Sequence, residues 1–533
     1  MPQMQSRFKL QLAILLALVG YLVFFGPDSM ARRFGEYSFF DSLVDIRTEI
    51  ERNYVTEPDG KKMLEGAING MIEPLNDPYT TYLDPEQLEG FDKSTRGSFS
   101  GIGAEIEVRD GELRIVSPLE DSPAFKAGVL AQDIIKEIDG KPTKGVTVHE
   151  AVEMITGPEG TPVKLTIIHP NGDEEVLTII RARIKIQTVK GFRRDDEHHW
   201  DFMLDDALKI GYVRLTQFTQ PTLDELVAAL KQFQDRGGKG LILDLRFNPG
   251  GLLDVAVSVS DQFLQEGKIV STRGRQGPSQ TWRATDDGVK EDFPMIVMVN
   301  GFSASASEIV SGALKDNDRA VVLGTRSFGK GSVQQVIGLE GGNGALKLTT
   351  AYYYLPSGRN LHRREESETW GVDPTDGFYV SMTVEQRMEM ARVRRETDVL
   401  NEEDGNGGGD EKVSPDWIRD ELKDIQLAAA VEAMTAKIED GEFKKVGRDN
   451  ATALTFVMER ENLIRQRRLL LERVEEIDKE MVEIEETLAQ EGVDVEDLER
   501  LDAVDSESND EADDDAQKDE SESDDQSKDE GTN

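Results

Sequence analysis

Cysteine is absent from this chain of 533 residues, and histidine occurs only five times. Without thiols the protein forms no disulfide framework, no thiolate metal site and no cysteine nucleophile. The HExxH pattern of zinc enzymes is also absent, and the adjacent histidines His198 and His199 would point apart on a helix or a strand. The sequence therefore predicts neither a metal site nor a cofactor.

Basic residues are few relative to acidic ones. The chain has 62 Lys and Arg against 104 Asp and Glu, and its formal net charge is −42. This balance argues against a nucleic-acid partner, because binding to phosphates needs basic patches. Part of the acidic excess lies in residues 501–533, which hold fifteen acidic residues, two lysines and no aromatic residue. We expect residues 491–533 to form a disordered acidic tail.

A long apolar run occurs near the N-terminus, at Leu10–Gly26. Its length is the lower limit for a transmembrane helix and is long for the core of a signal peptide. Ser29-Met30-Ala31 offers a small-x-small cleavage site. We interpret residues 1–31 as a signal peptide or a signal anchor, with a slight preference for the anchor. In either case the rest of the chain is exported.

A cluster of small residues, 301–307, lies between an apolar strand at Pro294–Val299 and a helical pattern. A serine in such a turn lies at a helix N-terminus, where unpaired N–H groups and the positive end of the dipole favour a developing oxyanion. The helical pattern consists of Ile309, Val310, Ala313 and Leu314.

A serine nucleophile needs a base, and none of the five histidines lies in this stretch. Lys330, which lies between two glycines, can serve if burial lowers its pKa. In the alternative interpretation Ser303, Ser305 and Ser307 are helix caps and Lys330 is a surface charge. Spacing alone favours this simpler alternative.

Four motifs change that balance: DLRFNPGG, GFSASASE, FGKGSVQ and YYLPSGR, which begin at residues 244, 301, 328 and 353. Together they resemble the C-terminal processing peptidases, also called tail-specific proteases, over roughly residues 40–380. The resemblance implies Ser305 as the nucleophile, Lys330 as the base and Gln334 as the residue that orients the lysine. It places the oxyanion donors on the backbone N–H groups of Gly251 and Ala306.

Between Gly97 and Ile186 short alternating strands are separated by Gly, Pro and Asn-Gly turns, with two short helices. This pattern resembles a PDZ domain. The residues Gly101, Ile102, Gly103 and Ala104 match its carboxylate-binding loop, where backbone N–H groups hold a chain terminus. The adjoining strand would pair with the bound peptide. A glycine-rich turn alone would more often be an ordinary turn.

An apolar heptad stripe runs through Phe456–Leu488 and is interrupted by Arg460 and Arg467. It predicts a coiled coil, or a helix that packs against a partner, and leaves open whether that partner is a second copy of this chain.

The predicted fold class is multidomain α+β with an α/β protease core and an inserted PDZ domain, and the family resemblance implies that this core is crotonase-like or caseinolytic-like. In the N-terminal helices the sequence suggests packing rather than chemistry. The predicted units are the signal segment 1–31, a helical segment 35–95, the PDZ domain 97–186, the serine peptidase core 187–380, a linker and C-terminal helix 381–435, a coiled coil 450–490 and the tail 491–533.

These features predict an exported serine endopeptidase that cuts polypeptides near their C-termini. The expected partners are polypeptides with free C-termini and the inner membrane, through the N-terminal segment. We expect the protein in the bacterial cell envelope, on the periplasmic side. The competing hypothesis is a catalytically silent PDZ scaffold that uses the same fold to hold chain termini.

Overall fold

The computed structural model describes residues 38–490 apart from 196–197, 277, 286–291, 365–366, 368, 400–412 and 450. The predicted signal segment 1–31 and the predicted tail 491–533 lie outside the described residues, as do residues 400–412 of the predicted linker and C-terminal helix. Within the described part of the chain, no helix is both long enough and apolar enough to span a membrane.

A mainly parallel sheet forms the centre of the peptidase region. Four parallel strands lie side by side in chain order, and two short antiparallel strands extend the edge beside the first. The four strands are nearly continuous apolar runs, as expected where both faces of a sheet are covered. The strands are β10 (Val189–Lys190), β13 (Met203–Asp205), β14 (Ile210–Leu215), β15 (Gly240–Asp244), β18 (Met295–Val299) and β19 (Val321–Gly324).

Side-chain alternation along these strands builds two apolar cores. Leu241 and Leu243 belong to the core on one face, which the helices α7, α8 and α9 complete. Ile242 and Ile296 belong to the core on the other face, which α11 and α12 cover. The covering helices are α7 (Thr222–Asp235), α8 (Leu253–Asp261), α9 (Ala306–Asp316), α11 (Pro415–Asp420) and α12 (Ile425–Asp440).

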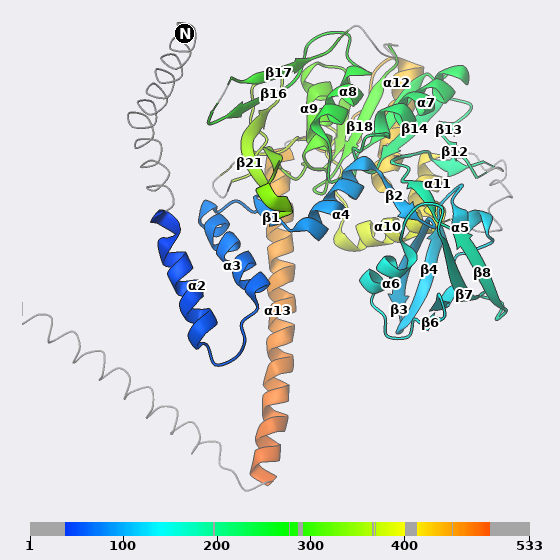
Figure 1. Ribbon diagram of the computed structural model, residues 1–533. Coiled ribbons are helices and arrows are strands. Elements are labelled where there is room, and N and C mark those ends of the chain that lie inside the picture. Colours follow the sequence, from blue (N-terminus) through cyan, green and yellow to red (C-terminus); the bar gives the residue numbers. More distant parts are fainter. Residues whose placement is uncertain are drawn as a thin grey trace, which may run out of the picture.

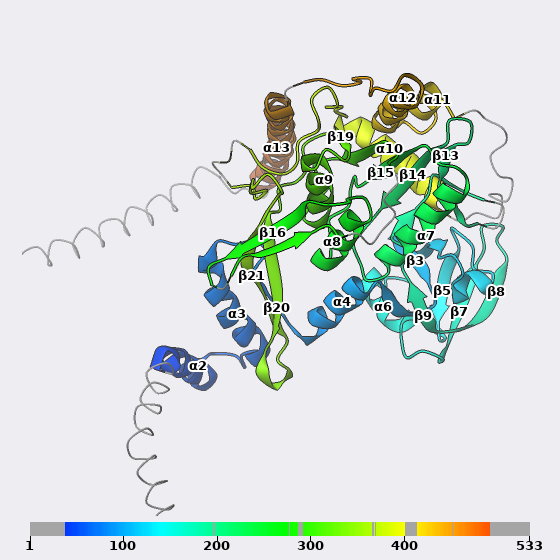
Figure 2. The ribbon, with the colours of Figure 1, turned by 90° about the horizontal axis from the view of Figure 1, so that it is seen from above.

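A second, antiparallel sheet carries a hairpin, in which β20 pairs with β21 (Figure 2). One strand of this sheet comes from the N-terminal segment, since Thr81 of β1 lies opposite Lys347 of β21. The N-terminal segment is therefore joined to the peptidase by backbone pairing. The strands are β1 (Thr81–Leu83), β16 (Lys268–Gly274), β17 (Gln280–Arg283), β20 (Ser332–Gly338) and β21 (Ala345–Tyr354), and the 3-10 turn η3 (Glu340–Gly342) lies within the hairpin loop.

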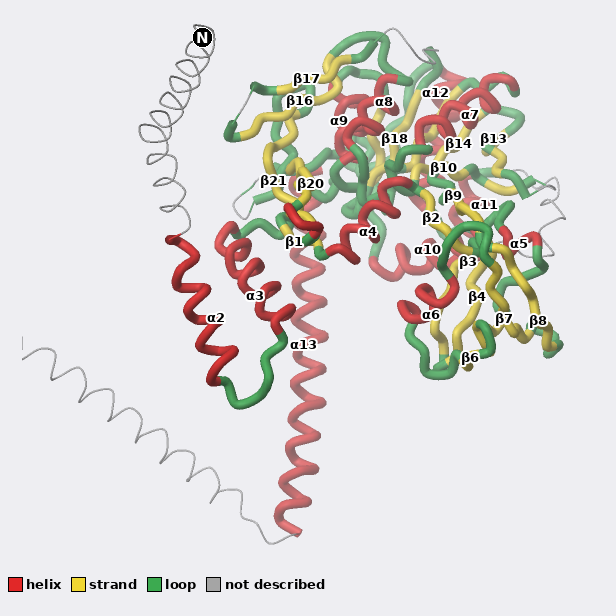
Figure 3. The backbone as a smooth tube through the Cα atoms, in the orientation of Figure 1, coloured by secondary structure: helices red, strands yellow, loops and turns green. Residues whose placement is uncertain are grey.

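The predicted PDZ pattern forms a separate antiparallel sheet (Figure 3). Its chain enters and leaves through a two-stranded ribbon, in which Ser98 lies opposite Lys185. Arg194 also joins the sheet to the peptidase, since its Nη1 lies 2.7 Å from Glu120 Oε2. The elements are β2 (Ser98–Gly101), β3 (Ala104–Arg109), β4 (Glu112–Pro118), α5 (Pro123–Lys126), β5 (Ile134–Ile138), β6 (Lys141–Pro142), α6 (Val148–Ile155), β7 (Pro162–Ile168), β8 (Glu174–Ile180) and β9 (Ala182–Lys185), followed by the ribbon β11 (Arg193–Arg194) and β12 (Trp200–Asp201).

The predicted N-terminal helices are present. A reciprocal hydrogen-bonded cap between Asp84 and Gln87 begins α4, and Gly97, at φ +62°, ends it. The apolar side chains on α2 are exposed, so this face has no partner among the described residues. The elements are η1 (Ser38–Phe40), α2 (Asp41–Asn53), α3 (Gly60–Ile72), η2 (Glu73–Leu75) and α4 (Pro85–Arg96).

The C-terminal region corrects two expectations. The predicted unit 381–435, a linker and one C-terminal helix, contains an additional helix, α10 (Val384–Asp398), and its C-terminal part forms two helices, α11 and α12. The break includes Lys423 at φ +56°, and the Asp424 side chain caps α12 by accepting from Leu427 N. The predicted helix of the coiled-coil segment is present as α13 (Ala451–Gln490), a single rod that projects from the body (Figure 1). Its association with a partner stays a prediction.

Candidate active site

The small-residue cluster forms a tight turn between β18 and α9, with Ser305 at the helix N-cap. Ser305 has φ +56° and ψ −111°, a backbone conformation that non-glycine residues rarely adopt. Its N–H donates to Glu308 Oε2 at 2.8 Å, which holds the turn. The apolar residues of α9 are fully buried against β18 and β19, so the helix N-terminus is rigidly placed behind the serine.

The three serines of the turn have different roles. Ser303 Oγ donates to Leu245 O at 2.8 Å, and Ser307 Oγ donates to Asn248 O at 2.9 Å. Both hydroxyls are buried and bound to the backbone. Ser305 is the serine of this turn that lines the large groove described below.

The Asn-Pro-Gly-Gly loop after β15 packs directly against the serine turn. Asn248 Oδ1 accepts from Gly250 N at 2.9 Å, and Asn248 O accepts from Ala304 N at 3.0 Å. Gly250 has φ +100°, and a Cβ at this position would come within 2.8 Å of Ser305 Cβ. The loop therefore needs glycine there to approach the serine.

Two backbone donors beside Ser305 are unpaired. Among the described residues, the N–H groups of Gly251 and Ala306 have no hydrogen-bond acceptor. Gly251 has φ +148°, and a Cβ there would come within 2.1 Å of Phe218 O. Ala306 N is the first amide of α9, where the helix leaves N–H groups free. These are the two donors that the resemblance named.

Glu308 ties the serine turn to the lysine loop, although the sequence analysis assigned it no role. Its fully buried carboxylate accepts from Ser305 N at 2.8 Å and Ser327 Oγ at 2.6 Å. It also accepts from Gly329 N at 2.6 Å and Lys330 N at 2.8 Å. Burial raises the pKa of Glu308, and these donors oppose the rise. A signal existed in the sequence, since Glu three residues after a helix cap is typical of a capping box.

Lys330 is half-buried and lines the same groove as Ser305. Burial, and then the charge of Lys347, lower the pKa of Lys330, while Glu308 and Asp77 oppose that change. The Nζ atom lies 5.0 Å from the ring centroid of Tyr79. In the described structure no hydrogen bond joins this Nζ to Ser305.

Gln334 lies on β20 in the same groove. Its Nε2 donates to Ser332 Oγ at 2.9 Å and to Thr349 Oγ1 at 3.0 Å. Its expected role in orienting Lys330 stays a prediction, because the described residues show no bond between the two side chains.

The groove that contains these residues has a volume of about 1260 Å³. Tyr353 lines it, and burial raises the pKa of this phenol to about 12, while a hydrogen bond with Ser305 opposes the rise. Phe91 and Thr95 of α4 line another part of the groove. The groove is thus built from the peptidase core and the N-terminal segment, and an extended chain in it would lie against Ser305, Lys330 and Gly251.

Comparison with known proteins identifies the family. The chain is 42% identical over 411 residues to a carboxy-terminal-processing protease of Bartonella bacilliformis, covering 75% of this chain and 89% of that protein. The chain belongs to the carboxy-terminal processing protease family. It is also 38% identical over 328 residues to the carboxy-terminal processing protease CtpA of Bacillus subtilis, covering 61% of this chain and 67% of that protein.

The match extends over three regions of this carboxy-terminal processing protease. Residues 209–376 match peptidase family S41, residues 114–168 match a PDZ domain, and residues 38–87 match the N-terminal domain of the activating protease CtpB. Among solved structures, a photosystem II D1 C-terminal processing protease is 29% identical and covers 63% of this chain and 85% of that chain, with a TM-score of 0.37. The predicted family, the PDZ domain and the serine-type peptidase class are confirmed.

The PDZ loop of this protease has the predicted open donors. The carbonyls of Ile102 and Gly103 accept from Ala124 N and Leu119 N, at 2.8 and 2.9 Å. Their own N–H groups have no acceptor among the described residues. Gly103 has φ +78°, and a Cβ there would come within 2.4 Å of Ser122 Cβ, so the loop requires glycine.

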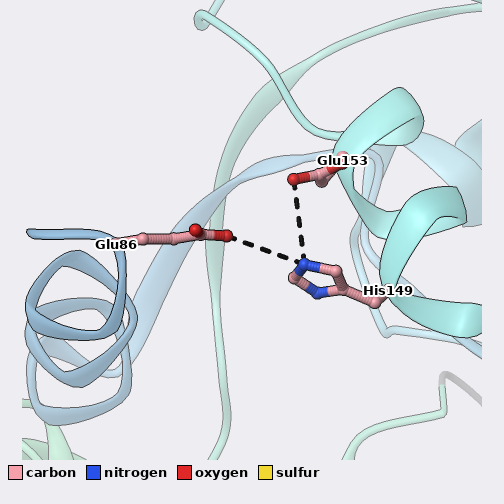
Figure 4. A group of neighbouring side chains, drawn as sticks. All are labelled: Glu86, His149 and Glu153. Carbon is pink, nitrogen blue, oxygen red and sulfur yellow. Dashed lines mark ion pairs between the residues drawn. The ribbon is translucent and has the colours of Figure 1, made fainter. Parts of the chain in front are cut away.

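A group of side chains with metal-ligating atoms lies between α4 and the PDZ helix α6 (Figure 4). His149 Nε2 lies 3.6 Å from Glu86 Oε1 and 3.8 Å from Glu153 Oε1. All three side chains are more than 60% exposed, so water solvates each of them. The arrangement is that of a surface ion pair between α4 and α6 when His149 is protonated. A second group consists of the partly buried Glu120 and the exposed Asp121 and His199.

Proposed function

We propose that this protein is an exported serine endopeptidase that cleaves polypeptides near their C-termini, with Ser305 as nucleophile and Lys330 as general base. One observation carries the proposal. Ser305, Gly251 and Lys330, whose pKa is lowered by burial, line one groove, and the unpaired N–H groups of Gly251 and Ala306 lie beside the serine. These are the parts that acyl transfer requires.

The reaction follows from these positions. Neutral Lys330 takes the proton of Ser305 Oγ as the oxygen attacks the scissile carbonyl carbon. The N–H groups of Gly251 and Ala306 donate to the resulting oxyanion. The ammonium of Lys330 then gives its proton to the leaving amine, and an acyl-enzyme on Ser305 remains. Water, deprotonated by Lys330, attacks the ester, and Ser305 regains a proton as the new carboxylate leaves.

The amine of Lys330 has to turn toward Ser305 before it reacts, while it stays beside the Tyr79 ring. In this structure Lys330 Nζ lies over Tyr79 and makes no bond to Ser305 in the described chain. Catalytic hydrogen bonds are often long in enzymes without substrate and tighten when substrate binds. We infer that the bound substrate brings Lys330 to Ser305, and that Gln334 then orients the amine.

The PDZ domain supplies recognition of the substrate's end. The free N–H groups of Ile102 and Gly103 fit a terminal carboxylate, and Gly101 and Ala104 complete the loop. The edge of β3 would pair with the last residues of the peptide. The domain is an insertion in a crotonase-like or caseinolytic-like core, and its ends lie together, since Ile186 N donates to Gly97 O at 2.9 Å.

The cellular setting belongs to the same proposal. The apolar run at 10–26 exports the chain, so the enzyme acts in the bacterial envelope on the periplasmic side and is anchored in the inner membrane. Exposed apolar residues of α13, among them Leu463, Leu470 and Ile477, support association with a second copy or a partner helix.

The proposal is tested with a serine-reactive active-site probe and a peptide substrate. The probe should label Ser305, and Ser305→Ala and Lys330→Arg should abolish hydrolysis, because Arg stays charged. The matched variants Ser303→Ala and Ser307→Ala should keep substantial activity. An unlabelled, inactive wild-type protein that still binds peptide would support the silent scaffold, and near-normal turnover by Ser305→Ala would refute the dyad.

A further inference from the structure

The loop 76–80, which joins the N-terminal helices to β1, lies against the predicted base. Tyr79 is half-buried, and its ring centroid lies 5.0 Å from Lys330 Nζ. An ammonium within about 6 Å of an aromatic ring face is attracted by the ring quadrupole, whereas a neutral amine is attracted far less. The ring therefore favours the protonated form of this lysine.

Hydrogen bonds fix the position of Tyr79. Asp77 Oδ1 accepts from Tyr79 N at 3.1 Å, and Asp77 Oδ2 accepts from Thr80 Oγ1 at 2.6 Å. Thr80 Oγ1 in turn accepts from Thr349 N on β21, at 3.1 Å. Because Thr80 is buried and β1 pairs with β21, the loop is attached to the catalytic sheet rather than to the surface.

The same contacts reach the third residue of the predicted site. Thr349, which donates its N–H to Thr80, accepts from Gln334 Nε2 at 3.0 Å through its own Oγ1. Loop 76–80 thus touches Lys330 through Tyr79 and is one residue removed from Gln334. A packing role alone does not require both contacts.

We propose that Tyr79 is a positioning residue for the reaction, whose ring holds the amine of Lys330 in the groove and stabilises the ammonium formed when Lys330 takes the proton of Ser305. The inference rests on the proposed dyad. It assigns a chemical role to the N-terminal segment, which lies some 250 positions from the lysine in the chain.

Other charged groups also affect the pKa of Lys330, and substitutions of Tyr79 do not remove them. Lys347 of β21 repels the ammonium, while Asp77 of the loop and Glu308 of α9 attract it. His362 packs edge-on to Tyr79, with ring centroids 6.2 Å apart. Burial and the charge of Arg364 lower the pKa of His362, so its ring is neutral at neutral pH and adds no charge beside the lysine.

The test is the pH dependence of kcat/KM for a peptide substrate, measured on the full-length protein. Tyr79→Leu removes the ring, so the rising limb should move to lower pH by about half a unit or more, and the plateau should fall several-fold. Tyr79→Phe, which keeps the ring, should restore the limb to its wild-type position. Tyr82→Leu makes the same change three residues away, where the side chain bonds to Asn343 O, and should not move the limb.

A second variant tests the inference even if Tyr79→Leu fails to fold. Replacing Tyr79 with pentafluorophenylalanine keeps the shape of a ring and reverses its quadrupole, and it should move the limb in the same direction as Tyr79→Leu. If both variants lower the plateau of kcat/KM but leave the rising limb at its wild-type pH, Tyr79 has a structural role only and the inference is overturned. Activity in Lys330→Arg would instead overturn the proposed dyad, so the two failures are distinguishable.

Discussion

Single residues decide whether this site can work, and two of them make long-range contacts that motif spacing does not reveal. Ser305 and Lys330 stand in local patterns, a small-residue turn before a helix and a lysine between glycines. Tyr79 and Glu308 act through contacts with segments far away or through a buried carboxylate, and neither contact appears in a local pattern. Motifs identify groups whose chemistry is local, whereas the residues that place those groups emerge from packing.

Lys347 gives a prediction of opposite sign to the one for Tyr79. Lys347 lines the groove, and its positive charge is the second-largest cause, after burial, of the lowered pKa of Lys330. Lys347→Met removes this repulsion, so the pKa of Lys330 should rise and the rising limb of kcat/KM should move to higher pH. Activity at neutral pH should fall because less of the lysine is neutral.

The measurement is a pair of pH profiles with one uncharged peptide substrate, for wild type and Lys347→Met. Arg283→Met, in β17 of the same sheet, is a suitable control for the loss of one positive charge outside the groove. A limb that moves to lower pH, or that moves equally in both variants, would contradict the assignment of Lys347.

At the scale of elements, the buried strands could be predicted because both faces of the central sheet are covered. β18 was anticipated from Pro294–Val299 and found at Met295–Val299. Helix α10 was missed because only Met390 in it is buried, so it has no apolar stripe. Its attachment is ionic instead. Arg394 of α10 lies 3.3 Å from Asp244 and 3.1 Å from Asp424, a contact that periodicity does not reveal.

Arg246 is the centre of this buried charge network. It is 2% exposed and makes hydrogen bonds to Asp244, at the end of β15, and to Asp424, at the start of α12. Burial would raise the pKa of Asp424, but Arg246 and Arg394 hold it below its ordinary value. The network connects the C-terminal helices to the strand that leads into the Asn-Pro-Gly-Gly loop.

Arg246→Met should therefore destabilise the protein by about 3–5 kcal/mol, because it leaves buried carboxylates short of a partner. The pH dependence follows from the lowered pKa. In wild type, this stabilisation is present above the unfolded carboxylate pKa of about 3.9 and is lost as pH falls through the lower folded value. As the pH falls through this range, the free energy of unfolding of Arg246→Met should decrease less than that of wild type.

Urea unfolding followed by tryptophan fluorescence measures both effects. Arg392→Met is the control, on α10, the helix that carries Arg394 of the network. Arg392 is 55% exposed, and its ion pairs within the described chain are with its helix neighbours Glu389 and Glu396. Such exposed pairs contribute roughly 0–1 kcal/mol. Equal loss of stability in the two variants would show that the network is no more important than a surface ion pair.

At the scale of the whole molecule, the order of units along the chain could be predicted, but their junctions could not. The N-terminal segment, expected to provide packing, supplies β1 to the catalytic sheet and α4 to the groove wall. α4 also faces the PDZ helix α6 through Glu86 and His149 (Figure 4). The helix α4 thus contacts the PDZ domain and lines the groove, and no change of composition along the chain indicates this double contact.

The last prediction joins these two parts. Backbone N–H donors at Ile102 and Gly103 suit an anion, so amidating a substrate's C-terminus removes a charge-assisted hydrogen bond that contributes about 1.5–3 kcal/mol. Cleavage of the amidated peptide by the intact enzyme should be slower by roughly one to two orders of magnitude. Because α4 contacts the PDZ domain and also lines the groove, binding of a carboxylate at residues 101–104 can also affect Ser305 and Lys330. The effect of amidation should then be larger on kcat than on KM.

The comparison uses matched peptides with free and amidated ends, cut by wild type and by a variant lacking Gly97–Ile186. These two residues are hydrogen-bonded to each other, so the deletion joins chain ends that already meet. The variant should cut both peptides at the same rate, because it has lost the anion site but keeps Ser305 and Lys330. If the intact enzyme also cuts both equally fast, the loop does not read the carboxylate. The preference for C-termini must then arise in the groove, from the length of chain that fits between the dyad and its far end.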